Sequence, residues 1–247
     1  DTKALLKKMV LSATYRQNSV LRRDLLTKDP ENLLLARGPS QRLSAEMVRD
    51  TALAASGLLD DAAGGPPVSP YLPGDLWRES NTMSPAYHQS VGPGLYRRSL
   101  YTVWKRTAPM PDMTAFDAPS REVCVLKRTP TATPQQAFVL LNDVQFVEAS
   151  RVLAEKTIQE GGSSPKQRIR FAFRRLTGRY PESRETKLLV QLLREQAAIF
   201  AKEPNRARQL IAVGDRKADP SLKPIELAAM TELTQAILNL DATIWKR

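Results

Sequence analysis

The sequence predicts a mainly α-helical fold, an irregular helical array that carries a long loop segment rich in proline and aromatic residues. Both ends of the chain place apolar residues at intervals of three and four, the spacing that forms one face of a helix. Between Gly64 and Pro134, by contrast, lie eleven of the eighteen prolines, four of the six tyrosines and two of the three tryptophans. Disordered linkers are poor in aromatic residues, so we expect this segment to be ordered.

The N-terminal part, residues 1–60, is expected to be helical. Asp1 suits the cap of a first helix, and a second short helix is predicted from Val20 to Leu26. The first helix has an apolar face of Leu5, Leu6, Met9 and Val10. A longer helix should follow Gly38-Pro39-Ser40. Its apolar stripe is predicted to be Leu43, Met47, Thr51, Ala54, Ala55 and Leu58, with Glu46, Arg49 and Asp50 mostly outside the stripe.

The irregular insertion, residues 64–133, allows one short β-ribbon. Leu95 to Trp104 alternates well enough for a strand, and Glu122 to Lys127 is its predicted partner. A two-stranded ribbon is not stable alone, so we expect it to pack on the helices.

The C-terminal part, residues 134–247, is predicted to return to helices. Thr133-Pro134-Gln135-Gln136 fits a capping box and opens a helix to about residue 159, and Ser164 to Gln167 repeats the arrangement. Further helices are expected after Pro181, Pro204 and Pro224.

We interpret residues 1–247 as one domain, and because the chain begins at Asp1 we expect it to be part of a longer multidomain protein. The longest apolar runs are four or five residues, far too short for a membrane-spanning helix. The net charge is +11, and residues 166–208 hold twelve Lys/Arg against four Glu. Such a face attracts polyanions, or it is simply a solvated helical surface.

A single cysteine and a single histidine exclude several chemistries. Cys124 cannot form an internal disulfide, and His88 alone cannot complete a zinc site or a Ser-His-Asp triad, so no metal site is predicted. Because Val123 and Val125 flank Cys124, we expect a buried thiol, whereas His88 lies in a polar stretch and should be solvated or capping.

Six segments in order carry a family resemblance: SATYRQNS (12–19), RLSAEMVRD (42–50), RRSLYTVWKR (97–106), FDAPSREVC (116–124), TPQQAFVLLND (133–143) and LTQAILNLD (233–241). They resemble the planctomycete domain of unknown function found C-terminal to planctomycete cytochrome-c-like domains. The resemblance implies an exported protein, periplasmic or on the cell surface. It also implies a cytochrome-c-like region and a second unknown domain upstream as partners. Any haem would belong to that missing region, so no cofactor is expected in this chain. Genes of such proteins often lie near sulfatases and other polysaccharide-degrading functions.

The candidate ligand-binding residues combine guanidinium or ammonium groups with aromatic rings. They are Arg98, Tyr101, Trp104, Lys105, Arg106 and Arg128. Planar guanidinium groups form paired hydrogen bonds with carboxylates and sulfates, and aromatic rings stack on sugars, so this set suits an acidic glycan. The alternative is that the cations pair with nearby carboxylates and that the aromatic residues anchor the loop.

Weak catalytic candidates are the carboxylates Asp112, Asp117 and Glu122, because glycoside hydrolysis needs two carboxylates at a defined separation. No complete catalytic constellation is visible, and no signature of specific nucleic-acid binding follows the basic helix after Lys166. We therefore expect a non-catalytic binding or docking domain that contacts an acidic glycan or a partner domain. The alternatives are a carbohydrate-active enzyme that uses the loop carboxylates and a structural component of a cell-surface assembly.

Overall fold

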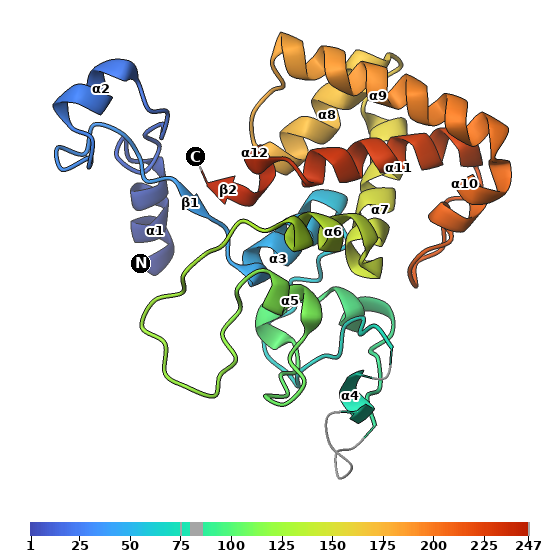
Figure 1. Cartoon of the computed structure of the whole chain (residues 1–247), viewed down its shortest axis with the longest axis horizontal. Helices are drawn as coiled ribbons and strands as arrows, with labels where there is room; N and C mark the ends of the chain where they lie inside the picture. The colour runs from blue at the N-terminus through green and yellow to red at the C-terminus, as the bar shows by residue number, and fades with distance from the viewer. Residues whose placement is uncertain (75, 80–85, 247) are drawn as a thin grey trace. The chain divides into compact units, whose positions relative to one another are not determined.

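The computed structural model describes residues 1–74, 76–79 and 86–246, and it is mainly helical with a small two-stranded antiparallel sheet (Figure 1). The predicted fold class is confirmed. By its internal contacts the chain divides into two compact units. Unit 1 consists of residues 1–43 with those from Ile244 onward, and unit 2 consists of Ser44–Thr243.

Unit 1 holds two helices and the small sheet. Its elements are α1 (Thr2–Leu11), α2 (Arg23–Lys28), β1 (Gln41–Arg42) and β2 (Trp245–Lys246). Asp1 caps α1 as predicted, because its Oδ1 accepts a hydrogen bond from the Lys3 N–H at 2.9 Å. β1 and β2 are antiparallel, with Gln41 opposite Lys246.

Unit 2 contains the remaining helices. They are α3 (Ala45–Ser56), α4 (Leu76–Glu79), the 3₁₀ turns η1 (Gly92–Tyr96) and η2 (Ser99–Tyr101), α5 (Pro111–Ala115), α6 (Pro134–Asn142), α7 (Val144–Glu160), α8 (Pro165–Thr177), α9 (Ser183–Lys202), α10 (Pro204–Ile211) and α11 (Pro224–Leu238). The single-turn helix α12 (Asp241–Ile244) leads into β2. No helix among the described residues is long and apolar enough to span a membrane.

Helix α7 lies at the centre of unit 2. It packs against α3, α6, α8 and α11, and α9 and α10 pack on α11 (Figure 1). Most of its residues are buried, including polar and charged ones such as Glu148, Arg151 and Glu155. A helix buried on nearly every side needs partners for such groups, so α7 must carry an internal polar network.

The prediction of one continuous helix from 134 to 159 is wrong, because the helix is interrupted at Asp143. This residue has extended backbone angles, ends α6 and begins α7. Its carboxylate accepts a hydrogen bond from the Gln145 N–H at 2.9 Å. Aspartate caps a new helix better than it continues an old one, and this local preference divides the segment into two helices.

Arg49 is the largest departure from the predicted apolar stripe of α3. Its side chain is 1% exposed, although we predicted it mostly outside the stripe, whereas Met47 on the predicted stripe is 55% exposed. The guanidinium donates to Gln145 Oε1 at 2.7 Å, to the Arg97 carbonyl at 2.7 Å and to the Leu95 carbonyl at 2.8 Å. Arg49 thereby joins α3, α7 and the irregular insertion.

The same contacts explain why the predicted ribbon is wrong. Leu95 to Trp104 contains the 3₁₀ turns η1 and η2 in place of a strand. Two carbonyls of this segment bond to Arg49, and the Ser99 N–H donates to Asp50 Oδ1 at 2.8 Å. Side chains of α3 therefore satisfy some of the backbone groups that a partner strand would use, and Asp60 and Val68 bond others in isolated bridges. The predicted partner, residues 122–127, is an exposed loop.

Cys124 is exposed, so the prediction of a buried thiol is wrong. It lies in a loop from Asp117 to Thr131 whose ends meet, because the Asp117 carboxylate accepts from the Thr131 N–H at 2.7 Å and its Oγ1 at 2.9 Å. The apolar neighbours Val123 and Val125 are also exposed. Apolar neighbours in sequence did not indicate burial, because residues 120–131 of this loop are all exposed. His88 is exposed, as expected.

We expect Arg49→Lys to lower the free energy of unfolding by about 3 kcal/mol, because lysine cannot reach three separate acceptors and leaves buried carbonyls without a donor. Urea unfolding monitored by circular dichroism measures the change. The exposed Arg98→Lys serves as the matched control and should change stability by less than about 0.5 kcal/mol. Equal stabilities for the two variants would contradict a stabilising role of the three Arg49 hydrogen bonds.

Candidate functional site

The ring and hydroxyl of Tyr101, a predicted ligand-binding residue, contact other residues of the chain. The Arg97 guanidinium lies 3.9 Å from the centre of its ring. Its hydroxyl accepts a hydrogen bond from the Gly64 N–H at 2.8 Å. This contact fixes the ring in the insertion and covers one face of it.

Trp104 and Lys105 also contact the insertion. Trp104 Nε1 donates to the Ser120 carbonyl at 3.1 Å, and Arg121 lies 4.8 Å from its ring. Lys105 Nζ donates to the Trp77 carbonyl at 2.9 Å and lies 4.9 Å from the Trp77 ring. Both side chains therefore help to hold the loop segments together.

Arg128 forms two hydrogen bonds to Glu46, at 2.6 and 2.9 Å, which lower the pKa of the Glu46 carboxyl to about 2. Arg98 and Arg106, by contrast, are exposed and have no polar partner among the described residues. Four of the six predicted ligand-binding side chains thus have internal partners in the described structure. Ligand binding by this set stays a prediction.

The three candidate carboxylates lie in different environments. Asp112 is buried in the first turn of α5, and burial raises its pKa. Asp117 is engaged by Thr131, and Glu122 is exposed in the loop. Nothing in their described contacts pairs them with one another, and a catalytic role for any of them stays a prediction.

Asp112 instead lies close to a carboxylate that the sequence analysis missed. Burial, followed by the charge of Asp112, raises the pKa of Asp143 to about 6, while the backbone hydrogen bond from Gln145 and the Arg49 guanidinium oppose the shift. The sequence contained one signal for Asp143, its position after Asn142 within a predicted helix, where aspartate is unfavourable.

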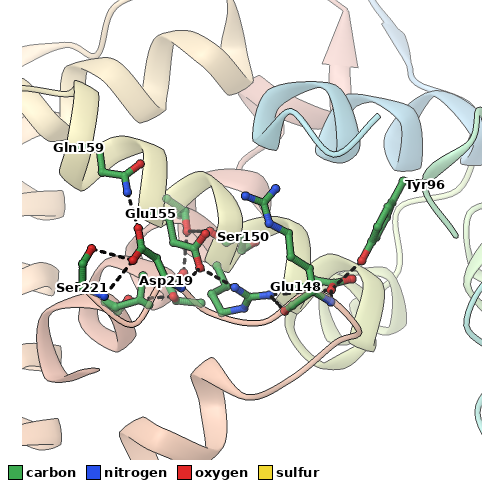
Figure 2. Close-up of polar contacts among 12 residues, drawn as sticks. Tyr96, Glu148, Ser150, Glu155, Gln159, Asp219 and Ser221 are labelled. Carbon is green, nitrogen blue, oxygen red and sulfur yellow. Dashed lines mark hydrogen bonds and ion pairs between the residues drawn. The ribbon is translucent and has the colours of Figure 1, made fainter. Parts of the chain in front are cut away.

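A second buried cluster is centred on Glu148 of α7 (Figure 2). The carboxylate is fully buried and accepts from the Tyr71 hydroxyl at 2.9 Å, the Tyr96 hydroxyl at 3.0 Å and the Arg216 N–H at 2.8 Å. Burial, followed by the charge of Glu148, raises the pKa of Tyr96 to about 12. Three donors compensate the loss of water around the carboxylate.

The cluster continues along α7 to Glu155 (Figure 2), which is paired with Arg151 one turn earlier. Arg151 is 2.5 Å from Glu155 and also donates to the Arg216 carbonyl, while Glu155 accepts from the Asp219 N–H at 3.3 Å. These bonds attach the loop between α10 and α11 to α7. A cavity of about 460 Å³ adjoins the cluster and is lined in part by Tyr96 and Arg216. The charged groups of the cluster bond to one another and to the loop, which is the arrangement of a structural network, although Arg151 Nε has no hydrogen-bond partner among the described residues.

Three further cations without a partner among the described residues gather in a groove of about 650 Å³ between α8 and α9. Its lining residues are Lys166, Pro181, Ser183, Thr186, Lys187, Val190, Gln191, Arg194 and Glu195. None of the predicted ligand-binding or catalytic residues lies there. The sequence signal that pointed to this region was the excess of positive charge in residues 166–208.

The geometry of α9 explains the lining. Lys187, Val190, Gln191 and Arg194 are spaced i, i+3, i+4 and i+7, so they share one face of the helix. Lys166 comes from the first turn of α8, which Ser164 and Gln167 fix through the predicted capping box.

The three cations of the groove, Lys166, Lys187 and Arg194, are exposed and have no hydrogen-bond or ion-pair partner among the described residues. The single carboxylate in the lining, Glu195, accepts from the Gln191 amide at 2.8 Å. The groove therefore presents uncompensated positive charge beside hydroxyl groups, which suits an anionic ligand that also carries hydrogen-bonding groups.

Over residues 1–193 the sequence matches the family PSD1, described as proteins of unknown function (DUF1553). The chain belongs to the PSD1 family. The match ends within α9, so α10 and α11 lie beyond it. No curated protein and no solved structure matches the chain. The expected domain of unknown function is confirmed, whereas the planctomycete source and the cytochrome-c-like neighbour stay predictions.

Asp143→Asn should change how the stability of this PSD1 domain depends on pH. The folded pKa of about 6 exceeds the ordinary 3.8, so the folded state binds more protons between these values and stability falls as pH rises through them. Asparagine keeps the cap and removes the charge, so the variant should gain about 2 kcal/mol at pH about 7.5 and little at pH about 4. Urea unfolding at both pH values measures this. The exposed Asp61→Asn is the control, and an equal gain at both pH values would contradict the assignment.

Gly214→Ala tests the Glu148 cluster. Gly214 has φ +95°, and a Cβ there would lie 2.4 Å from the Glu148 carboxyl carbon. We expect a loss of about 3 kcal/mol, because backbone strain adds to displacement of a buried, hydrogen-bonded carboxylate. Gly64→Ala is the matched control, since Gly64 has φ +79° with open space around it, and it should lose about 1 kcal/mol. Similar losses in thermal unfolding would show that strain alone accounts for the effect.

Proposed function

We propose that this PSD1 domain is a non-catalytic binding domain that holds an acidic polysaccharide in the groove between α8 and α9. The observation that carries the proposal is the set of three unpaired cations, Lys166, Lys187 and Arg194, in one groove. Other cations near the groove have partners, as in the bidentate contact of Arg179, just after α8, with Glu185 of α9.

The other lining residues suit a sugar chain. Ser183, Thr186 and Gln191 offer hydroxyl and amide groups that exchange hydrogen bonds with sugar hydroxyls. Pro181 and Val190 add apolar surface for the C–H faces of sugar rings. The described groove has no aromatic side chain in its lining, so it lacks the stacking platform that single-stranded nucleic-acid binding uses.

The lining also favours binding over hydrolysis. Glycoside hydrolysis uses two carboxylates on either side of the scissile bond, whereas this groove has Glu195 as its one carboxylate, already bonded to Gln191. The carbohydrate-active enzyme therefore has less support than the binding domain. A role as a structural part of a cell-surface assembly has no specific contact in its favour.

The resemblance of the sequence supports a setting for this activity. We infer that the domain is part of an exported, planctomycete-type protein, periplasmic or at the cell surface, and that it follows a cytochrome-c-like region and a second unknown domain. In that setting the groove keeps a polysaccharide near the upstream domains. Docking onto those domains through the segment from Arg97 to Arg128 is compatible with glycan binding at α8 and α9.

A binding screen against sulfated, carboxylated and neutral polysaccharides tests the proposal, at about 10 mM and about 150 mM salt. We expect one acidic polysaccharide to bind at both salt concentrations. Lys187→Gln with Arg194→Gln should weaken that binding about tenfold or more, corresponding to about 1.4 kcal/mol. The matched control is Arg98→Gln with Arg106→Gln, which removes the same charge from the other candidate segment and should change affinity less than twofold.

Two results would contradict the proposal that the groove binds the polysaccharide. Loss of binding in the Arg98 and Arg106 control alone would assign the ligand to the irregular insertion. Equal losses in both double variants, with no binding left at about 150 mM salt, would indicate non-specific attraction to a basic surface.

A further inference from the structure

Unit 1 has very little hydrophobic core. Among its described residues, the buried apolar side chains are Leu25 and Ile244. Helix α1 has no buried residue at all. A unit this small normally buries its apolar side chains to be stable, and a contiguous apolar surface left open marks a binding face.

Helix α1 is amphipathic, and its apolar face points into solvent. The apolar face consists of Leu5, Leu6, Met9 and Val10, which are 43–54% exposed. At about 100° per residue these four lie within an arc of about 140°. The flanking cations are Lys3 and Lys7 on one edge and Lys8 on the other. This order, an apolar stripe with lysines along both edges, is the pattern of a helix that lies in a membrane interface.

A second apolar feature of unit 1 is a turn of three leucines, Leu33, Leu34 and Leu35, which are 67–78% exposed. The Asp29 carboxylate fixes the turn by accepting from the Leu33 N–H at 2.7 Å and the Leu34 N–H at 2.9 Å. Asn32 adds a bond from the Arg37 N–H at 3.1 Å. The leucines are thus held outward by a defined backbone.

The charge of unit 1 indicates what covers these apolar side chains. Its sequence contains eleven lysines and arginines and four acidic residues, a balance of +7. A second copy of the unit would carry the same charge and repel it. An anionic lipid surface offers apolar chains beneath negative headgroups, and lysine side chains reach those headgroups while their stems stay on apolar surface.

We propose that unit 1 docks onto an anionic lipid bilayer, with the apolar face of α1 in the interface and Lys3, Lys7 and Lys8 at the headgroups. The contact is peripheral and reversible, because a single short helix buries limited apolar area. It uses a different unit from the glycan groove and does not depend on it.

The test is sedimentation of the whole chain with vesicles of phosphatidylcholine, with and without one third phosphatidylglycerol. Binding should be at least about tenfold stronger to the anionic vesicles and should weaken with salt. Leu5→Gln with Met9→Gln should weaken it about tenfold or more. The matched control is Ala4→Gln with Leu11→Gln, on the opposite side of α1, which should change it less than threefold. Glutamine is a good helix former and all four positions are exposed, so circular dichroism should show unchanged helix content.

Lys3→Gln with Lys7→Gln should also weaken binding about tenfold, whereas the groove variant Lys187→Gln with Arg194→Gln should leave it unchanged. Three results would overturn the proposal. They are absent binding to anionic vesicles, equal effects of the two α1 double variants, and concentration-dependent dimers that Leu5→Gln with Met9→Gln abolishes. The last result would assign the apolar face to a contact between copies of the chain.

Discussion

The buried ion network on α7 is the constraint on which unit 2 depends. Glu148, Arg151 and Glu155 are almost completely inaccessible, so each charge must be matched by a donor or acceptor within the protein. The partners come from the insertion, through Tyr71 and Tyr96, and from the loop between α10 and α11. Removing any partner would leave a buried charge unpaired in a medium of low dielectric constant. These distant segments are therefore fixed to one helix. These contacts help to order the irregular insertion, whose own backbone pairing is limited to isolated bridges such as that of Val68 with Thr102.

Arg49 extends the same principle to the other side of the insertion. A guanidinium with fixed donor directions takes the carbonyls of Leu95 and Arg97, while Asp50 takes the Ser99 N–H. The Arg49 contacts and the Glu148 cluster are linked through α7, since Arg49 also donates to Gln145 in the first turn of α7. Side chains of α3 and α7 thereby perform the work that backbone ladders perform in a β-rich insertion.

The parts of the fold that sequence predicted are those set by local chemistry. Pro134 and Pro165 follow capping residues and begin helices where the capping boxes indicated. The errors involve long-range contacts. Arg49 is charged, so its position in the core depends on acceptors that lie about fifty and a hundred residues away, which periodicity does not reveal. Of the candidate site, the excess positive charge was predictable, but the groove was not, because it depends on how α8 packs against α9.

The distribution of acidic residues explains how a chain with 26 carboxylates presents unpaired cations. Glu148 and Glu155 of α7 are buried with internal partners, Asp112 is buried in α5, and Glu46 is paired with Arg128. Carboxylates used in this way compensate internal donors and cannot neutralise the cations of α8 and α9, which extend from the core into solvent. The excess of 37 lysines and arginines over 26 carboxylates gives the surface its positive potential, and the pairing inside the protein decides which carboxylates remain outside to reduce it. A variant that removed a buried carboxylate would disturb the fold before it altered the groove, whereas substitutions at Lys187 and Arg194 change the groove alone. That separation is what makes binding at the groove testable without loss of structure.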